Sequence, residues 1–192
     1  MTENSSHRLV QSVLVSINGV IGEPLKWAGR YFGEGSATHS LATLRRSDGF
    51  LMGRRTYEIF SRQWPGATGP YADALNHARK YVFSSTLREA EWNNTTVISG
   101  DVVEAVRTLK QGNDLVFYGH GQFGQTLVDA GLVDELTLTL VPVSVPGGTP
   151  LFRDGGESRH WELVQAGPGH DPGLASLTYR PASSDTVQDT AA

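Results

Sequence analysis

The sequence predicts an α/β protein with three layers, in which a mixed and mainly parallel sheet is flanked by helices and gains antiparallel strands at its C-terminal edge. Two observations support this class. Short apolar segments alternate with segments of helical apolar spacing through the first two thirds of the chain, as is typical of a parallel sheet covered on both faces. The last third shows strand-like alternation without a helical pattern.

A single domain is expected, because 192 residues suffice for one hydrophobic core and the sequence contains no internal repeat. The hydrophobic fraction of 39% is that of an ordinary globular protein. We expect the domain to span residues 1–180. The small and polar residues 181–192 are expected to form a disordered tail.

In the N-terminal half, an alternating strand over residues 8–17 ends at an Asn-Gly turn signal. A loop rich in glycine and aromatic residues follows over residues 20–35. Ser36 is placed to cap a helix over residues 36–47. The further elements expected in this half are a strand over 50–52, a helix over 54–63, a polar helix or turn over 71–78 and a strand over 80–83.

In the C-terminal half, two more strand–helix pairs are expected before the antiparallel segments. The predicted elements are a strand over 95–98, a helix from 101, a strand over 115–118, a helix to 130, a long strand over 135–143 and a final strand pair over 160–166 and 173–180. Pro142 lacks an N–H donor and so predicts that the long strand ends at a sheet edge or a bulge.

Composition excludes several classes of function. The net charge of −4 and the absence of a Lys/Arg run argue against nucleic-acid or anionic-membrane binding. With zero cysteines, disulfides, thiolate catalysis and cysteine metal sites are ruled out, and the six histidines show no metal-ligand spacing, so no metal is expected. No signal segment or bilayer-length apolar stretch is visible, and a cytoplasmic location is the expectation.

The clearest local motif is a GxGxxG at residues 119–124, placed between an apolar strand and a helix. Glycines allow close backbone approach to a phosphate, and the helix start offers free N–H groups. The alternative is a glycine-rich turn without a ligand. A Rossmann site for NAD is disfavoured, because the next strand ends without the acidic residue that holds a ribose 2′-hydroxyl.

Two other strand ends carry anion-binding residues. Gly53 is followed by Arg54, Arg55 and Thr56 at a helix start, where two cations oppose the helix dipole unless an anion lies between them. Solvated surface arginines are the alternative. A third strand is followed by three hydroxyl residues, Ser84, Ser85 and Thr86, which equally suit a turn.

Because the carboxyl ends of parallel strands share one edge of a sheet, the three strand ends can face one ligand. Arginines and hydroxyls in place of a ribose-binding acid indicate NADPH rather than NADH.

The order along the chain of NGVIG at 18–22, MGRRTYE at 52–58, FSS at 83–85 and the late GxGxxG resembles the dihydrofolate reductase superfamily, and most closely the branch that contains the riboflavin-biosynthesis reductase domain and its stand-alone relatives. The resemblance extends over roughly residues 10–179 and includes the segments EWNNT at 91–95, ISGD at 98–101 and LVDEL at 132–136. It implies a dihydrofolate-reductase-like fold, NADPH as hydride donor and a homodimer.

The resemblance also assigns roles by position. The cofactor would be held by Gly53, Arg54, Arg55 and Thr56, by Ser84, Ser85 and Thr86, and by Gly119, Gly121, Gln122, Phe123 and Gly124, with Val20, Ile21 and Gly22 in a mobile loop over the nicotinamide. The substrate pocket would be lined by Trp27, Tyr31, Phe32, Tyr57 and Phe60.

One departure from the family pattern concerns the acid. Dihydrofolate reductases place a carboxylate on the first helix, whereas here the nearest acid, Glu34, lies before the predicted helix. Glu34 is the candidate proton donor and His39 a candidate to share that role, with solvated residues as the alternative.

We therefore expect an NADPH-dependent reductase of a small heterocyclic substrate. By family analogy this is a ribosylamino-pyrimidine, such as 5-amino-6-(5-phosphoribosylamino)uracil in riboflavin biosynthesis. A dihydrofolate- or pteridine-type reductase and a non-catalytic NADPH-binding protein are the alternatives.

Overall fold

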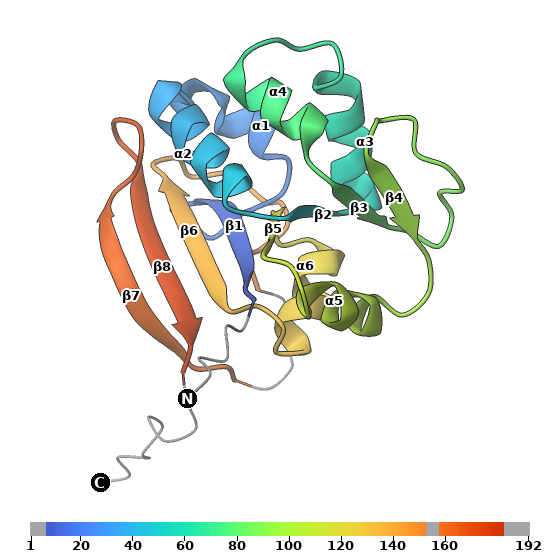
Figure 1. The fold of residues 1–192 in the computed structure, drawn as a ribbon. Coiled ribbons are helices and arrows are strands. Elements are labelled where there is room, and N and C mark those ends of the chain that lie inside the picture. Colours follow the sequence, from blue (N-terminus) through green and yellow to red (C-terminus); the bar gives the residue numbers. More distant parts are fainter. Residues whose placement is uncertain (1–6, 153–157, 183–192) are drawn as a thin grey trace, which may run out of the picture.

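The computed structural model describes residues 7–152 and 158–182. Eight strands form one sheet in the order β4-β3-β2-β5-β1-β6-β8-β7 (Figure 1). The first six strands in sequence pair in parallel, while β6, β8 and β7 pair in antiparallel fashion. The strands are β1 Leu9–Ser16, β2 Gly49–Gly53, β3 Lys80–Phe83, β4 Thr95–Ile98, β5 Leu115–Tyr118, β6 Glu135–Val141, β7 Trp161–Pro168 and β8 Ala175–Pro181.

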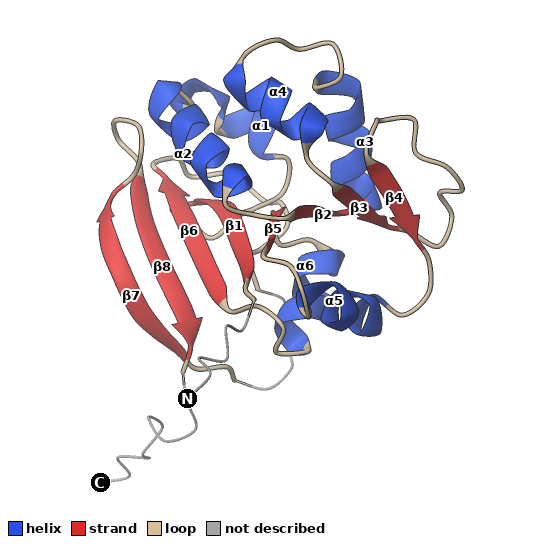
Figure 2. Ribbon diagram, viewed as in Figure 1, coloured by secondary structure: helices blue, strands red, loops and turns tan. Residues whose placement is uncertain are grey.

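Helices cover both faces of the parallel part of the sheet (Figure 2). Helices α1 to α4 gather on one side, and α5 and α6 on the other. They are α1 Pro24–Trp27, α2 Glu34–Arg45, α3 Arg54–Gln63, α4 Pro70–His77, α5 Val102–Lys110 and α6 Gln122–Asp129, with a 3-10 turn at Gly29–Tyr31. None of the helices in the described ranges is long and apolar enough to cross a bilayer. The predicted α/β class with antiparallel strands at one edge is confirmed.

Each helix layer closes its own apolar core against the sheet. On the α5 and α6 side, Leu127 and Val106 pack against alternate residues of β1 and β5 such as Val13 and Phe117. On the opposite side, Leu44 of α2 and Leu75 of α4 belong to a second core with Phe50, Met52, Val82 and Val116. The two-residue period of the strands therefore divides the apolar residues between two cores.

The start of α2 differs from the prediction. The helix begins at Glu34 rather than at Ser36, so the expectation that Glu34 lies before the helix was wrong. The reason is a tertiary cap: the carboxylate of Asp171, in the β7–β8 connection, accepts the amides of Gly33 (2.9 Å), Gly35 (3.0 Å) and Ser36 (2.9 Å). A hydrogen bond from the Ser36 side chain, followed by those from the backbone amides, lowers the pKa of Asp171 to about 2.

Two further boundaries differ. The segment 20–35, expected as a loop, contains α1 and the 3-10 turn. Strand β6 ends at Val141, so Pro142 follows the strand and β6 lies between β1 and β8 rather than at an edge. Strand β8 reaches Pro181, one residue into the predicted tail, and residues 183–192 lie outside the described ranges.

Candidate functional site

Three neighbouring strands of the sheet, β3, β2 and β5, run parallel, so their carboxyl ends lie side by side. Each is followed by one of the three motifs singled out in the sequence. Ser84 follows β3, Gly53 closes β2 at the start of α3, and Gly119 follows β5 shortly before α6. We call these the β3, β2 and β5 corners. Their adjacency means that the helix starts of α3 and α6 lie beside one another in the sheet order.

An aromatic contact joins the three corners. Phe123, in the first turn of α6, stacks on Phe83 at the end of β3 with ring centroids 4.9 Å apart. The Cβ atom of Phe123 lies 3.1 Å from the position that a Cβ on Gly53 would occupy. Gly53 therefore allows α6 to approach the end of β2 without a steric clash.

The β2 and β3 corners are also linked by polar contacts. Arg54 donates from Nη1 to the hydroxyl of Thr86 and from Nε to Glu58, 2.6 Å away on α3. Ser84 Oγ accepts the amides of Thr86 and Leu87 at 3.2 and 3.0 Å, so it stabilises the turn that presents these hydroxyls. Arg54, Arg55 and Thr86 are exposed, and both arginines project from the first turn of α3.

The segment after β1 is held in place by a second segment of the chain. Val20 bridges Pro150, and the Ile21 amide donates to the Thr149 carbonyl at 2.9 Å. Val20 and Ile21 are buried. The hydrogen bond to Lys26 and the charge of Lys26 lower the pKa of Glu23, which lies in the same segment.

The aromatic residues predicted for the substrate pocket fall into two groups on the α1–α4 side of the sheet. Tyr57 and Phe60 pack in the core above β2 and β5, where the Tyr57 hydroxyl accepts the Glu91 amide at 3.0 Å. Trp27 and Tyr31 pack with Leu14 and Val141 in a separate cluster. Phe32 is 43% exposed and belongs to neither group.

Between these groups, the central strand β1 is incompletely covered. Its residues alternate between burial under α6 and partial exposure toward the α1–α4 side, where Ser12 and Leu14 are half-buried. In this region the buried Trp64 Nε1 has no hydrogen-bond partner among the described residues, whereas the buried Tyr118 hydroxyl interacts with the side-chain hydroxyls of Tyr71 and Ser40. Burial raises the pKa of Tyr118, so its hydroxyl stays protonated and able to donate.

Glu34 and His39 lie elsewhere. Both line a shallow hollow of about 530 Å³ with Gly35, Thr38, Ala42 and His170, a set that shares no residue with the three corners. His39 stacks on His170 with ring centroids 3.7 Å apart. Burial, followed by the charges of His170 and Arg46, lowers the pKa of His39 to about 4. The structure thus does not bring the candidate acid to the corners.

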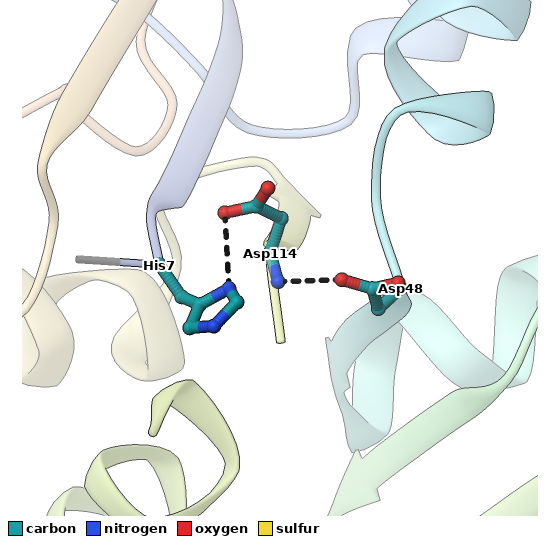
Figure 3. Close-up of side chains that lie close together, drawn as sticks. All are labelled: His7, Asp48 and Asp114. Carbon is teal, nitrogen blue, oxygen red and sulfur yellow. Dashed lines mark hydrogen bonds and ion pairs between the residues drawn. The ribbon is translucent and has the colours of Figure 1, made fainter. Parts of the chain in front are cut away.

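A cluster of side chains at the amino ends of the central strands was not predicted from the sequence (Figure 3). His7 Nδ1 lies 3.9 Å from Asp114 Oδ1, and the Asp114 amide donates to Asp48 at 2.8 Å. Asp114 Oδ1 also accepts the Arg8 amide at 2.8 Å. Both carboxylates therefore bind backbone N–H groups where β1, β2 and β5 begin, and we interpret the cluster as a junction of strand starts.

Two buried polar residues lie beneath the β5 corner: His120, which the sequence suggests as an anion ligand or a plain loop histidine, and Gln11, which the sequence did not single out. Gln11 of β1 is fully buried, and His120 is 4% exposed. Gln11 Nε2 lies 2.7 Å from His120 Nδ1 and donates to the Gly119 carbonyl at 2.8 Å. A signal was present, since Gln11 interrupts the apolar series Leu9, Val13 and Val15 on one face of β1.

Comparison with known proteins gives one family and several relatives. Residues 8–169 match the family model described as RibD C-terminal domain. The uncharacterized protein YyaP of Bacillus subtilis (strain 168) is 32% identical over 118 residues, which cover 58% of this chain and 62% of that protein.

Among solved structures, a putative riboflavin biosynthesis protein from Shewanella sp. PV-4 superposes with a TM-score of 0.76 at 22% identity, over 92% of this chain and 99% of that one. A dihydrofolate reductase from Enterococcus faecalis, solved with NADP(H), gives a TM-score of 0.62 at 19% identity, over 93% and 98% of the two chains. At these identities the likeness concerns the fold, which is the dihydrofolate-reductase-like fold that the sequence predicted.

Proposed function

Because the chain belongs to the RibD C-terminal domain family, a family of riboflavin-pathway reductases, we propose that it is an NADPH-dependent oxidoreductase that acts on a small heterocyclic or ribosylamino-pyrimidine substrate. 5-Amino-6-(5-phosphoribosylamino)uracil is the specific candidate. The observation that carries the proposal is the meeting of the three corners through Phe123, Phe83 and Gly53.

The residues at the corners fit a dinucleotide with an extra phosphate. The starts of α3 and α6 each leave up to four backbone N–H groups without an intrahelical acceptor, and they lie on adjacent strand ends. In our proposal these amides bind the pyrophosphate. Arg54 and Arg55, with the hydroxyls of the β3 corner, bind the adenosine 2′-phosphate, because a guanidinium can donate two parallel hydrogen bonds to it.

In this proposal, residues at the end of β1 would hold the nicotinamide. When bound, NADPH supplies a hydride to the substrate. The half-covered face of β1, with Ser12 and Leu14, is the proposed substrate position, and Trp64 Nε1 is a donor available for a polar ring edge. We further propose that the protein acts in the cytoplasm and forms a homodimer. Analytical ultracentrifugation would test the dimer.

A second candidate is a non-catalytic NADPH-binding protein. It is favoured by the position of Glu34, which is exposed and lines a hollow that contains no residue of the three corners. A pteridine-type reductase is a further alternative with the same cofactor.

The test is a calorimetric titration with NADPH and NADH, followed by an assay of NADPH oxidation with the ribosylamino-pyrimidine phosphate, dihydrofolate and a dihydropteridine. Turnover of the pyrimidine supports the proposal. Turnover of a pterin alone supports the folate-type alternative, and tight binding without turnover supports the binding protein. Failure to bind NADPH would overturn the proposal.

A further inference from the structure

A continuous hydrogen-bond chain runs beneath the glycine-rich corner. Gln11 Nε2 contacts His120 Nδ1 at 2.7 Å, His120 Nε2 contacts Gln125 Oε1 at 3.1 Å, and Gln125 Nε2 donates to Asp129 Oδ1 at 3.0 Å. The chain starts in the middle of the sheet on β1 and ends on the exposed carboxylate at the last residue of α6. It therefore connects the sheet, the loop after β5 and the helix α6.

The direction of every bond is fixed by groups that can only accept. The Gly119 carbonyl accepts from Gln11, so the atom of Gln11 beside His120 is the amide nitrogen. His120 Nδ1 is consequently an acceptor, and the ring is neutral with its proton on Nε2. At the other end, the Asp129 carboxylate accepts from Gln125, so Gln125 presents Oε1 to the imidazole proton. Both ends require the same tautomer.

This hydrogen-bond chain involves the first and third glycines of the motif. Gly119 has a φ of +85°, which favours glycine, and β1 holds both its backbone groups: Ser12 O accepts its amide at 2.8 Å and Gln11 donates to its carbonyl. A Cβ on Gly124 would lie 3.0 Å from Gln11 Nε2 and 3.1 Å from Gly119 O. The third glycine of the motif therefore leaves the space through which the Gln11 amide reaches the loop.

Burying this amide has a cost. Gln11 is fully buried, and its Oε1 has no hydrogen-bond partner among the described residues. An unpaired buried carbonyl is unfavourable, so an apolar residue would satisfy the core better at this position. The amide is instead used to fix Gly119 and His120, and Phe152 covers the imidazole edge-on with centroids 5.3 Å apart.

We infer that Gln11, His120 and Gln125 are positioning residues for the cofactor loop. They hold the free amides at the start of α6 in the geometry that a pyrophosphate requires, with His120 locked as the neutral Nε2–H tautomer. The inference rests on the proposed function for the identity of the ligand, but the tautomer and the rigidity of the loop belong to the protein without cofactor. The pyrophosphate is common to both dinucleotides. The hydrogen-bond chain from Gln11 to Asp129 therefore contributes equally to NADPH binding and to NADH binding.

The experiment compares Gln125→Met, which removes the acceptor for His120, with the double variant Gln125→Glu and Asp129→Asn, which retains a carboxyl oxygen for His120 and lets the amide at position 129 donate to the other oxygen. Gln11→Met is a second disrupting variant. Nitrogen-15 NMR of the histidines reports the His120 tautomer, amide hydrogen exchange reports the rigidity of residues 119–124, and calorimetry gives the affinities.

We expect wild-type His120 to carry its proton on Nε2. In both Met variants we expect faster exchange of the loop amides and a loss of about tenfold in affinity for NADPH and for NADH alike. The double variant Gln125→Glu and Asp129→Asn should retain the tautomer and most of the affinity.

An Nδ1–H tautomer in the wild type, or Met variants with unchanged loop exchange, would overturn the inference. If the wild type binds no NADPH, the proposed function fails, and the tautomer and the exchange rates still decide the inference. If NADPH binds the wild type and both Met variants equally, the positioning role fails while the proposed function stands.

Discussion

Phe123, in the first turn of α6, stacks on Phe83, the last residue of β3, although strand β2 lies between β3 and β5 in the sheet. The contact passes the end of β2 at Gly53, where a side chain would meet Phe123. The start of α6 is thereby held against two neighbouring strand ends. This packing, rather than any single motif, makes the three corners one surface.

The first prediction concerns the two arginines of α3. We expect Arg54→Ala combined with Arg55→Ala to weaken NADPH binding by about 100-fold, since charge-assisted hydrogen bonds to a phosphate contribute about 1.5–3 kcal/mol each. NADH lacks the 2′-phosphate and should lose much less. Calorimetric titration of both cofactors measures the difference. Arg62→Ala, exposed at the end of the same helix, is the matched control. An equal loss for the two cofactors would remove the 2′-phosphate assignment.

The second prediction concerns Gly53. Gly53→Ala should destabilise the protein by about 1–3 kcal/mol through overpacking against Phe123. Gly53→Ala should also weaken NADPH binding, because α6 must shift away from β2. Gly66→Ala is the control, since a Cβ there has no atom within 4 Å. Urea unfolding and cofactor titration of the two variants test this. Identical behaviour of both variants would show that the contact does not position α6.

The third prediction concerns the tertiary cap of α2. The pKa of Asp171 falls from 3.8 to about 2 in the folded protein, so its contribution to stability is present above pH 3.8 and is lost as the pH falls toward 2. Asp171→Asn should lower the unfolding midpoint at neutral pH and reduce the dependence on pH in that window. Thermal unfolding at several pH values measures both effects, with Glu162→Gln on β7 as the control. A variant with the wild-type midpoint would mean that the cap does not stabilise α2.

The fourth prediction concerns the stacked histidines. Because the pKa of His39 is lowered from 6.5 to about 4, the unfolded chain binds its proton first, and stability should decrease as the pH falls from 6.5 to 4. His39→Gln should remove about 1 kcal/mol of this decrease, after allowance for partial solvent exposure. The groups facing His39 are His170 and Arg46, with Glu34 in the same hollow. The exposed His160→Gln serves as control. An unchanged pH profile in His39→Gln would exclude this histidine as the cause.

The fold and the corners were predictable from sequence because their signals are local. An apolar strand, a glycine and a helix start within a few residues define each of the β2 and β5 corners, and the parallel topology then brings them to one edge. The family resemblance is likewise confirmed, since its motifs follow the same order over most of the chain.

Features that depend on distant residues were not predictable. The start of α2 is set by Asp171, 135 residues beyond Ser36, so no local capping signal marks it. The five predicted pocket aromatics separate because Trp27 and Tyr31 pack near β6, whereas Tyr57 and Phe60 pack over β2 and β5. Gln11 was visible as a polar residue on an apolar face, but its partner His120 could be identified only from the packing of β1 against β5.

The most direct test of the central claim is a crystal structure of the protein soaked with NADPH. The account predicts the pyrophosphate between the starts of α3 and α6, the 2′-phosphate against Arg54 and the hydroxyls of residues 84–86, and the nicotinamide beside β1. Cofactor density in the hollow beside Glu34 and His39, or anywhere that leaves the corners empty, would contradict it.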